Sequence, residues 1–65
     1  MNKVMNPENI EAGDLVTLLE PRGSDPTDLM KVESVGGRYE NKVYCKEIGH
    51  ELYATCFRLV RKGKP

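Results

Sequence analysis

The sequence predicts one small all-β domain, and three observations support this. The chain has 65 residues, which leave room for a single domain. Short runs rich in Val, Leu, Ile and Tyr are separated by breakers that contain Gly, Pro and Asp, which is typical of short strands joined by turns. Hydrophobic residues make up 38% of the chain and charged residues 31%, as in a lightly cored globular domain rather than a disordered tail.

The N-terminal part predicts an arm followed by a strand. Residues 1–12 are mostly polar, and we expect a loose arm with at most one helical turn, for which Asn6 suits the N-cap. Gly13 and Asp14 mark a turn. The leucine-rich, β-branched run 15–20 predicts the first strand of the domain.

A long loop and a second strand come next. Residues 21–28 contain two Pro, a Gly, a Ser and two Asp, all of which favour turns over a strand ladder. The alternation in 29–35 predicts a half-buried strand with Met30 and Val32 on its inner face. The pair Gly36-Gly37 then predicts a hairpin turn.

The rest of the chain divides into short elements. We expect a third strand over 43–48, a two-residue turn at Gly49-His50, a fourth strand over 51–55, a 3-10 turn over 56–58, a closing strand over 59–61 and a frayed basic tail over 62–65. Such strands, with a turn before the last one, describe a small five-stranded SH3-like barrel over residues 13–61. Closure of the sheet into a barrel also removes exposed edges.

The strand residues resemble those of the small YodC-like bacterial proteins. The shared pattern is Gly-Asp-x-Val-x-Leu at 13–18, Met-x-Val at 30–32, Val-x-Cys at 43–45, Ala-Thr-x-Phe at 54–57 and Leu-Val at 59–60. The resemblance covers residues 12–61. It departs in the loop 21–28, which is longer than the family's Gly-rich loop, and at Glu47, where the family often has Trp. The resemblance implies a small β-barrel and supplies no catalytic residues.

Cys45, His50 and Cys56 form the one metal-like spacing in the sequence. A turn at Gly49-His50 would place the imidazole about 10 Å from Cys45 along the ladder, and a closed zinc site needs four ligands, so we expect no metal or other cofactor. The two Cys would be diagonal neighbours, about 7–8 Å apart and too far for a disulfide. We therefore expect two buried free thiols and a solvated His50. Asp14, the other candidate for chemistry, fits ordinary turn chemistry.

The outer face of the third and fourth predicted strands gathers aromatic and basic residues. The expected register pairs Tyr44 with Thr55 and Lys46 with Tyr53, and Arg58 follows close by. Aromatic and cationic groups together can stack on bases or anchor a protein partner. The alternative is a structural cross-strand aromatic pair covered by the N-terminal arm.

The predicted function is a non-enzymatic binding module that contacts a protein partner through this outer face and the loop 21–28. The alternative is a weak nucleic-acid-binding protein, against which the zero net charge counts. Charge is uneven along the chain, with three bases and six acids in 1–32 (net −3) and seven bases and four acids in 33–65 (net +3), which favours self-association as a further possibility. The candidate partner-binding residues are Tyr44, Lys46, Tyr53, Arg58, Arg61 and Lys62.

Other classes of function are excluded on size and hydropathy. A preorganised catalytic cleft is hard to build in 65 residues, so we do not expect an enzyme. No apolar run approaches the roughly 18 residues of a membrane span, and the first residues lack a secretion signal. We therefore expect a cytoplasmic protein without a membrane partner.

Overall fold

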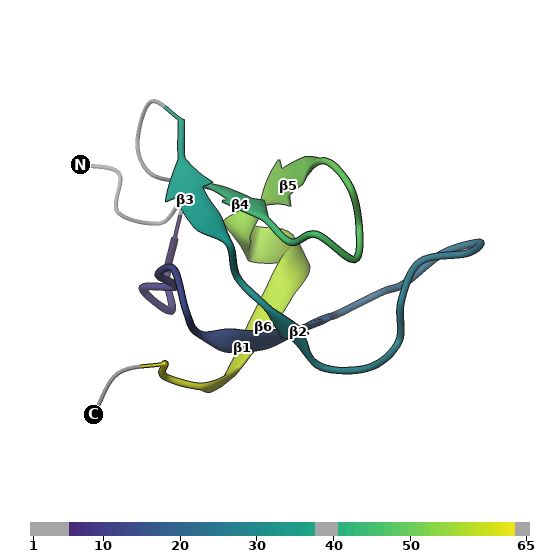
Figure 1. The fold of residues 1–65 in the computed structure, drawn as a ribbon, viewed down its shortest axis with the longest axis horizontal. Coiled ribbons are helices and arrows are strands. Elements are labelled where there is room, and N and C mark those ends of the chain that lie inside the picture. Colours follow the sequence, from purple (N-terminus) through teal and green to yellow (C-terminus); the bar gives the residue numbers. More distant parts are fainter. Residues whose placement is uncertain (1–5, 38–40, 64–65) are drawn as a thin grey trace.

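The computed structural model describes residues 6–37 and 41–63. These residues form short strands and one 3-10 turn, in the order β1 Leu15–Leu18, β2 Met30–Lys31, β3 Ser34–Gly36, β4 Lys42–Tyr44, β5 Glu51–Tyr53, η2 Ala54–Cys56 and β6 Phe57–Arg61. The strands make two antiparallel three-stranded sheets, ordered β2-β1-β6 and β3-β4-β5. In Figure 1 the first sheet crosses the lower part of the molecule and the second lies above it. The predicted all-β class is confirmed.

The predicted second strand is in fact two strands that belong to different sheets. The N–H of Val32 donates to the carbonyl of Asp14 (2.9 Å) and its own carbonyl accepts from Gly13 (2.9 Å), which prolongs the pairing of β2 with the first sheet. The next residue, Glu33, donates instead to the carbonyl of Tyr44 in β4 (2.8 Å). The chain therefore changes sheets between Val32 and Glu33, and a hydropathy pattern does not mark that change.

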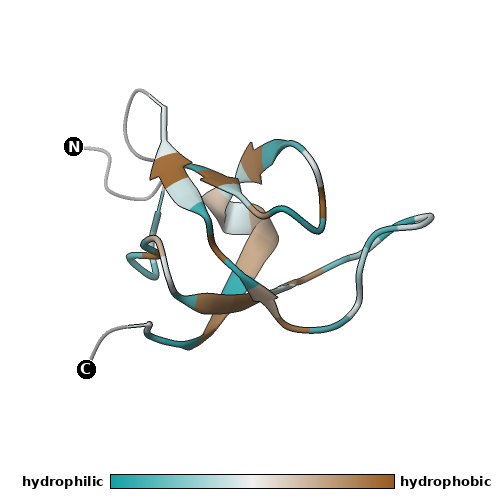
Figure 2. Ribbon diagram, viewed as in Figure 1, coloured by the Kyte–Doolittle hydropathy of each residue, from teal (hydrophilic) through white to brown (hydrophobic). Residues whose placement is uncertain are grey.

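The long loop expected after the first strand is confirmed. β1 ends at Leu18, two residues earlier than predicted, and β2 begins at Met30, so the connection contains the whole of 21–28. The loop projects from the body of the molecule, at the right of Figure 1. It is mostly hydrophilic, whereas hydrophobic residues concentrate in the strands (Figure 2).

The predicted two-residue turn at Gly49-His50 is wrong. β4 and β5 are joined by six residues, 45–50, and Tyr44 lies opposite Glu51. The carbonyl of Cys45 accepts hydrogen bonds from the N–H groups of Ile48 (3.0 Å) and Gly49 (3.1 Å), so the chain turns away directly after Cys45. Gly49 does have a positive φ, of 89°, but it lies at the end of this wider turn rather than at the centre of a tight one.

The predicted 3-10 turn before the last strand is present, two residues earlier than expected. It spans Ala54–Cys56 and ends where the N–H of Phe57 donates to the carbonyl of Ala54. Because the turn comes early, β6 spans Phe57–Arg61 rather than only 59–61, and it pairs with β1 along its length.

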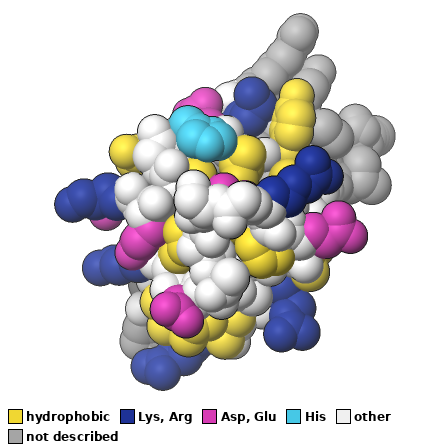
Figure 3. Space-filling model, turned by 90° about the vertical axis from the view of Figure 1, so that its right-hand side faces the viewer, with side chains coloured by type: hydrophobic (Ala, Val, Ile, Leu, Met, Phe, Trp, Pro, Cys, Tyr) yellow, Lys and Arg dark blue, Asp and Glu magenta, His cyan; other side chains and the backbone are white. Residues whose placement is uncertain are grey.

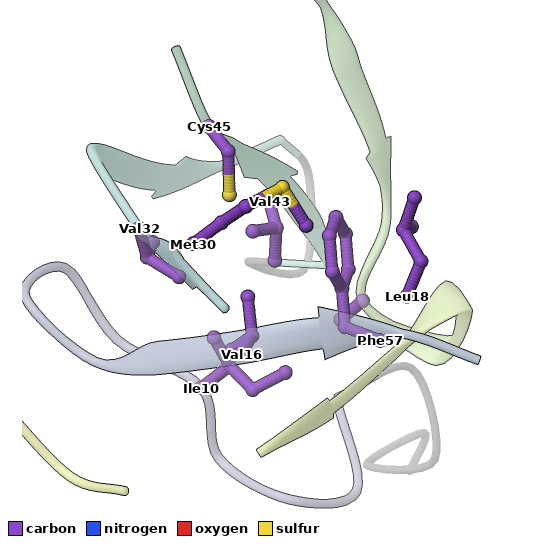
Figure 4. Close-up of a cluster of buried hydrophobic side chains, with 9 residues drawn as sticks. Ile10, Val16, Leu18, Met30, Val32, Val43, Cys45 and Phe57 are labelled. Carbon is purple, nitrogen blue, oxygen red and sulfur yellow. The ribbon is translucent and has the colours of Figure 1, made fainter. Parts of the chain in front are cut away.

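The core lies between the two sheets (Figure 4), and each sheet contributes to it. The buried hydrophobic residues are Ile10, Val16, Leu18, Met30, Val32, Val43, Cys45, Ala54 and Phe57. The alternation in the sequence correctly placed Met30 and Val32 on the inner face, and Cys45 is buried as expected. Full burial of an aliphatic or Phe side chain contributes about 1.5–3 kcal/mol each, so this small cluster supplies most of the drive for folding.

The predicted loose arm is wrong for residues 6–12, because this segment is attached to the rest of the fold by a core residue and a hydrogen bond to β6. Ile10 is only 2% exposed and belongs to the core. Asn6 brackets it, since its Oδ1 accepts the N–H of Ile10 (2.9 Å) and its Nδ2 donates to the carbonyl of Ile10 (3.1 Å). Glu8 Oε1 accepts the N–H of Leu59 (3.0 Å), which ties the arm to β6. Residues 1–5 of the expected arm lie outside the described residues.

Candidate functional site

Asp14 is the one buried carboxylate among the described residues, and its side chain joins the segment before β1 to the C-terminal residues Lys62 and Gly63. It is 1% exposed and precedes β1 directly. Its Oδ2 accepts the N–H of Glu11 (2.8 Å) and the ammonium of Lys62 (2.9 Å), and its Oδ1 accepts the N–H of Gly63 (2.8 Å). We call this group, Glu11, Asp14, Lys62 and Gly63, the Asp14 clasp.

Charges in the clasp stabilise one another. Burial alone would raise the pKa of Asp14, but hydrogen bonds from Gly63, Lys62 and Glu11 outweigh burial and lower the pKa below its ordinary value. The pKa of Lys62 is raised, mainly by its hydrogen bond to Asp14 and also by Glu11 (3.3 Å). Lys62 Nζ further donates to the carbonyl of Asn9 (2.8 Å). Asp14 is therefore a buried carboxylate whose two oxygens are already occupied by hydrogen bonds within the fold.

The predicted frayed tail is wrong for Lys62 and Gly63, because both belong to the clasp. A Cβ on Gly63 would overlap the carbonyl group of Gly13, so only glycine allows so close an approach of two backbones. Lys64 and Pro65 lie outside the described residues. Turn chemistry at Asp14 was correctly predicted through its bond to Glu11, but the partners 48 and 49 residues away were missed, since no local pattern marks them.

The predicted outer face is present, with one different cation. Tyr44 lies opposite Glu51, four residues away from the predicted partner Thr55. A register shift by an even number of residues leaves each side chain on the same face of the sheet, so Tyr44 and Tyr53 are still diagonal neighbours on one face. Lys42 lies opposite Tyr53, with its Nζ 4.8 Å from the ring centroid, in a cation–π contact. The predicted pairing of Lys46 with Tyr53 is wrong, since Lys46 is in the exposed loop 45–50.

The remaining candidate cations do not share a sheet with these tyrosines. Arg58 and Arg61 are exposed on β6, opposite Thr17 and Leu15 of β1. Lys62 is held by the clasp. The structure thus brings together the two tyrosines of the predicted set and distributes its cations over other elements.

A groove that the sequence did not predict lies between the projecting loop and the β5–η2 segment. Its volume is about 500 Å³, and its lining residues are Leu18, Leu19, Glu20, Arg22, Asp25, Leu52, Thr55 and Cys56. Leu19, directly after β1, is 55% exposed and contributes an apolar side chain to the groove. Figure 3 shows the side of the molecule toward which the loop projects, where hydrophobic side chains appear between charged ones. The available signal was the run Leu18-Leu19, in which alternation turns the second leucine outward.

A smaller hollow adjoins the groove. It has a volume of about 120 Å³ and is lined by Lys42, Glu51, Leu52, Tyr53 and Cys56. Leu52 and Cys56 line both hollows, so the two meet along β5 and η2. The outer-face Tyr53 is therefore part of the same surface as the groove.

The wall of the groove is an ordered turn within the loop. The N–H of Arg22 donates to Asp25 Oδ2 (3.0 Å), and the N–H of Asp25 donates to the carbonyl of Arg22 (2.9 Å). Gly23, between them, has a φ of 55°, a conformation that glycine adopts without strain. This reciprocal turn gives the loop a defined shape on the side that faces the groove.

Both cysteines are free thiols, as predicted, but only one of them is buried. Cys45 is in the core, where burial, with Glu47 and Glu33, raises its pKa to about 11. Cys56 is exposed, contrary to prediction, because η2 removes it from the β4–β5 ladder. His50 is exposed in the loop before β5, as expected. Within the described ranges, no group of three His, Cys, Asp or Glu side chains is arranged to hold a metal ion.

Comparison of the chain with protein-family models, with curated proteins and with solved structures gave no match. The resemblance to the YodC-like proteins thus stays a prediction. No helix within residues 6–37 and 41–63 has the length and apolar character needed to cross a membrane.

Proposed function

We propose that this chain is a non-enzymatic protein-binding module whose partner occupies the groove between the projecting loop and the β5–η2 segment. The observation that carries this proposal is the groove itself, with Leu19 55% exposed on one wall and Leu52 and Cys56 on the other. Exposed apolar residues rimmed by polar ones typically mark interaction sites. Tyr53, 52% exposed in the adjoining hollow, is the type of side chain that anchors protein interfaces.

We further propose that the two sheets represent a five-stranded SH3-like barrel. In support, β2 and β3 lie in one extended segment that leaves the first sheet at Val32 and enters the second at Glu33, so the two act as one bent strand. Counted this way, five strands remain, with a 3-10 turn before the last. The groove would then lie at one end of the barrel.

Two features favour a protein partner over catalysis or nucleic acid. All the polar contacts of Asp14, the one buried carboxylate in the described part of the chain, are used within the fold. The cations that a phosphate backbone requires are divided between the sheets, and Lys42 already covers the ring of Tyr53.

The test compares capture from lysate by the wild-type chain and two variants. Leu19→Asp places a charge in the groove, whereas Val60→Asp places one at a similarly exposed position (45%) on β6, outside the groove. With nuclease present throughout, we expect the wild type and Val60→Asp to capture the same protein. The amount captured by Leu19→Asp should be at least tenfold lower. Equal capture by both variants, or capture that nuclease abolishes, would contradict the proposal.

A further inference from the structure

We propose that the partner presents an extended segment which adds as a strand to the free edge of β5, with apolar side chains over the groove and a Lys or Arg at its acidic rim. This inference rests on the proposed function and specifies the chemistry of its ligand. It follows from the position of β5, the shape of the adjoining hollows and the charges around them.

β5 is an edge strand whose outward backbone groups can be assigned. Among the strands of the described residues, it pairs with β4 alone. The N–H of Ala54 donates to the carbonyl of Asn41 (2.7 Å), so this pair is of the hydrogen-bonded type. Because the two pair types alternate in an antiparallel ladder, Leu52 points its backbone groups toward β4, and Glu51 and Tyr53 point theirs toward the free edge.

The other side of β4 supports this assignment. The carbonyl of Tyr44, the partner of Glu51, accepts the N–H of Glu33 and therefore points away from β5. By the same alternation, the backbone groups of Glu51 point away from β4, and its carbonyl lies 3.3 Å from Nδ1 of the exposed His50. Among the described residues, the edge is thus available for the main chain of another strand, which would displace the exposed imidazole of His50.

The hollows beside β5 suit alternating side chains. A strand turns successive side chains to opposite faces, so a segment beside β5 would direct every second one toward the same side. On the groove side, Leu19, Leu52 and Cys56 offer an apolar surface of sufficient volume for a leucine-sized side chain. On the other side, Tyr53 and Lys42 offer an aromatic and aliphatic surface.

The rim of this surface carries acids without an ionic partner. Glu20 and Asp25 line the groove and Glu51 lines the smaller hollow. Both salt bridges of the described residues involve Lys62, so none of these three carboxylates is in one. Arg22 is the one cation lining the groove, which leaves a net negative rim there and favours a basic side chain on the partner.

The experiment is a selection of random twelve-residue peptides on the full-length chain. We expect enriched peptides with alternating apolar residues, at least one Lys or Arg, and no Pro within the alternating stretch. The best peptide is then made in two N-methylated forms, each modified at every second residue. Methylation of the peptide nitrogens that face β5 should weaken binding at least tenfold. Methylation of the alternate nitrogens, which face away from β5, should leave the affinity within about twofold.

Charge is tested with the same peptide and two charge reversals. Glu20→Lys, at the groove, should weaken binding at least fivefold, whereas Glu47→Lys, on the exposed loop outside both hollows, should not. Enrichment of Pro-rich or acidic peptides, equal effects of the two N-methylated forms, or no enrichment at all would overturn strand addition. The binding module itself would still stand if capture from lysate remained sensitive to Leu19→Asp, so the two proposals fail separately.

Discussion

A single carboxylate, Asp14, connects the two ends of the described chain. Three donors converge on it, two from the last described residues and one from the N-terminal segment. Burial of a charge is costly unless the charge is hydrogen-bonded, and here both oxygens of the buried carboxylate accept hydrogen bonds. The backbone carbonyl of Asp14 also accepts the N–H of Val32, so both the side chain and the main chain of this residue hold the fold together.

Replacement of Asp14 should be costly. Asp14→Ala leaves the N–H groups of Glu11 and Gly63 without their acceptor, and we expect the free energy of unfolding to fall by about 1–3 kcal/mol. Thermal unfolding followed by circular dichroism measures this loss. Asp28→Ala, at an exposed position, is the matched control and should change stability by less than about 0.5 kcal/mol. Equal midpoints for the two variants would show that the clasp is dispensable.

The clasp also predicts how stability depends on pH. The pKa of Asp14 is lowered from 3.8, so its contribution is fully present above pH 3.8 and is lost as pH falls through the folded value. The pKa of Lys62 is raised from 10.5, so its contribution is present below pH 10.5 and is lost as pH rises through the folded value. Urea titrations should therefore show the difference between wild type and Asp14→Ala narrowing below pH 3.8. A difference that stays constant down to pH 2 would refute the assigned direction.

The two thiols should differ in reactivity because their environments differ. With Ellman's reagent at pH 8, Cys56 should react at once in the folded chain, whereas Cys45, buried and with its pKa raised to about 11, should react only after denaturation. Cys56→Ser should remove the fast phase. Two thiols of equal rate in the native protein would contradict the placement of Cys45 in the core.

At the scale of elements, the fold depends on where strands stop. β4 ends at Tyr44 because Cys45 begins a turn, and β5 ends at Tyr53 because η2 follows. These two endings set the register, place Tyr44 and Tyr53 on one face, and bring Cys56 out to the groove. The Gly49-His50 pair predicted a tighter hairpin, but the main-chain bonds to Cys45 decide the true loop length.

The junction between Gly63 and the segment before β1 should tolerate no side chain. Gly63→Ala brings a Cβ into the carbonyl of Gly13, so the segment must move and the bond from Gly63 to Asp14 is lost. We expect a loss of about 1–3 kcal/mol in urea unfolding. Gly36→Ala is the control, because its Cβ would meet nothing within 4 Å. Comparable stability of both variants would show that residue 63 is not held as described.

At the scale of the whole molecule, the sequence predicted the all-β class and part of the core, but not the contacts between segments that are far apart in the chain. Alternation indicates which face of a strand is buried, so Met30 and Val32 were placed correctly on the inner face. The anchoring of Ile10, the Lys62–Asp14 pair and the groove all depend on segments far apart in the chain. Such contacts follow from the assembled sheets, and local patterns carry no signal for them.

The same limit explains the partial success with the binding surface. Tyr44 and Tyr53 were correctly placed on a common face, because an error in register by an even number of residues leaves side chains on the same face of the sheet. The part of Leu19 in the groove could not be predicted in the same way, because it depends on how the loop lies against β5 and η2. A binding surface made by a loop and a remote turn is thus visible only once the sheets are assembled.

The central claim, that a protein partner binds along β5 and the groove, is tested most directly by amide chemical-shift mapping of the labelled chain with its captured partner. We predict that the largest changes fall on Leu19, Leu52, Tyr53 and Cys56, with Arg58 and Val60 little affected. Changes centred on Arg58 to Arg61, with residues 19 and 52–56 unmoved, would contradict the account.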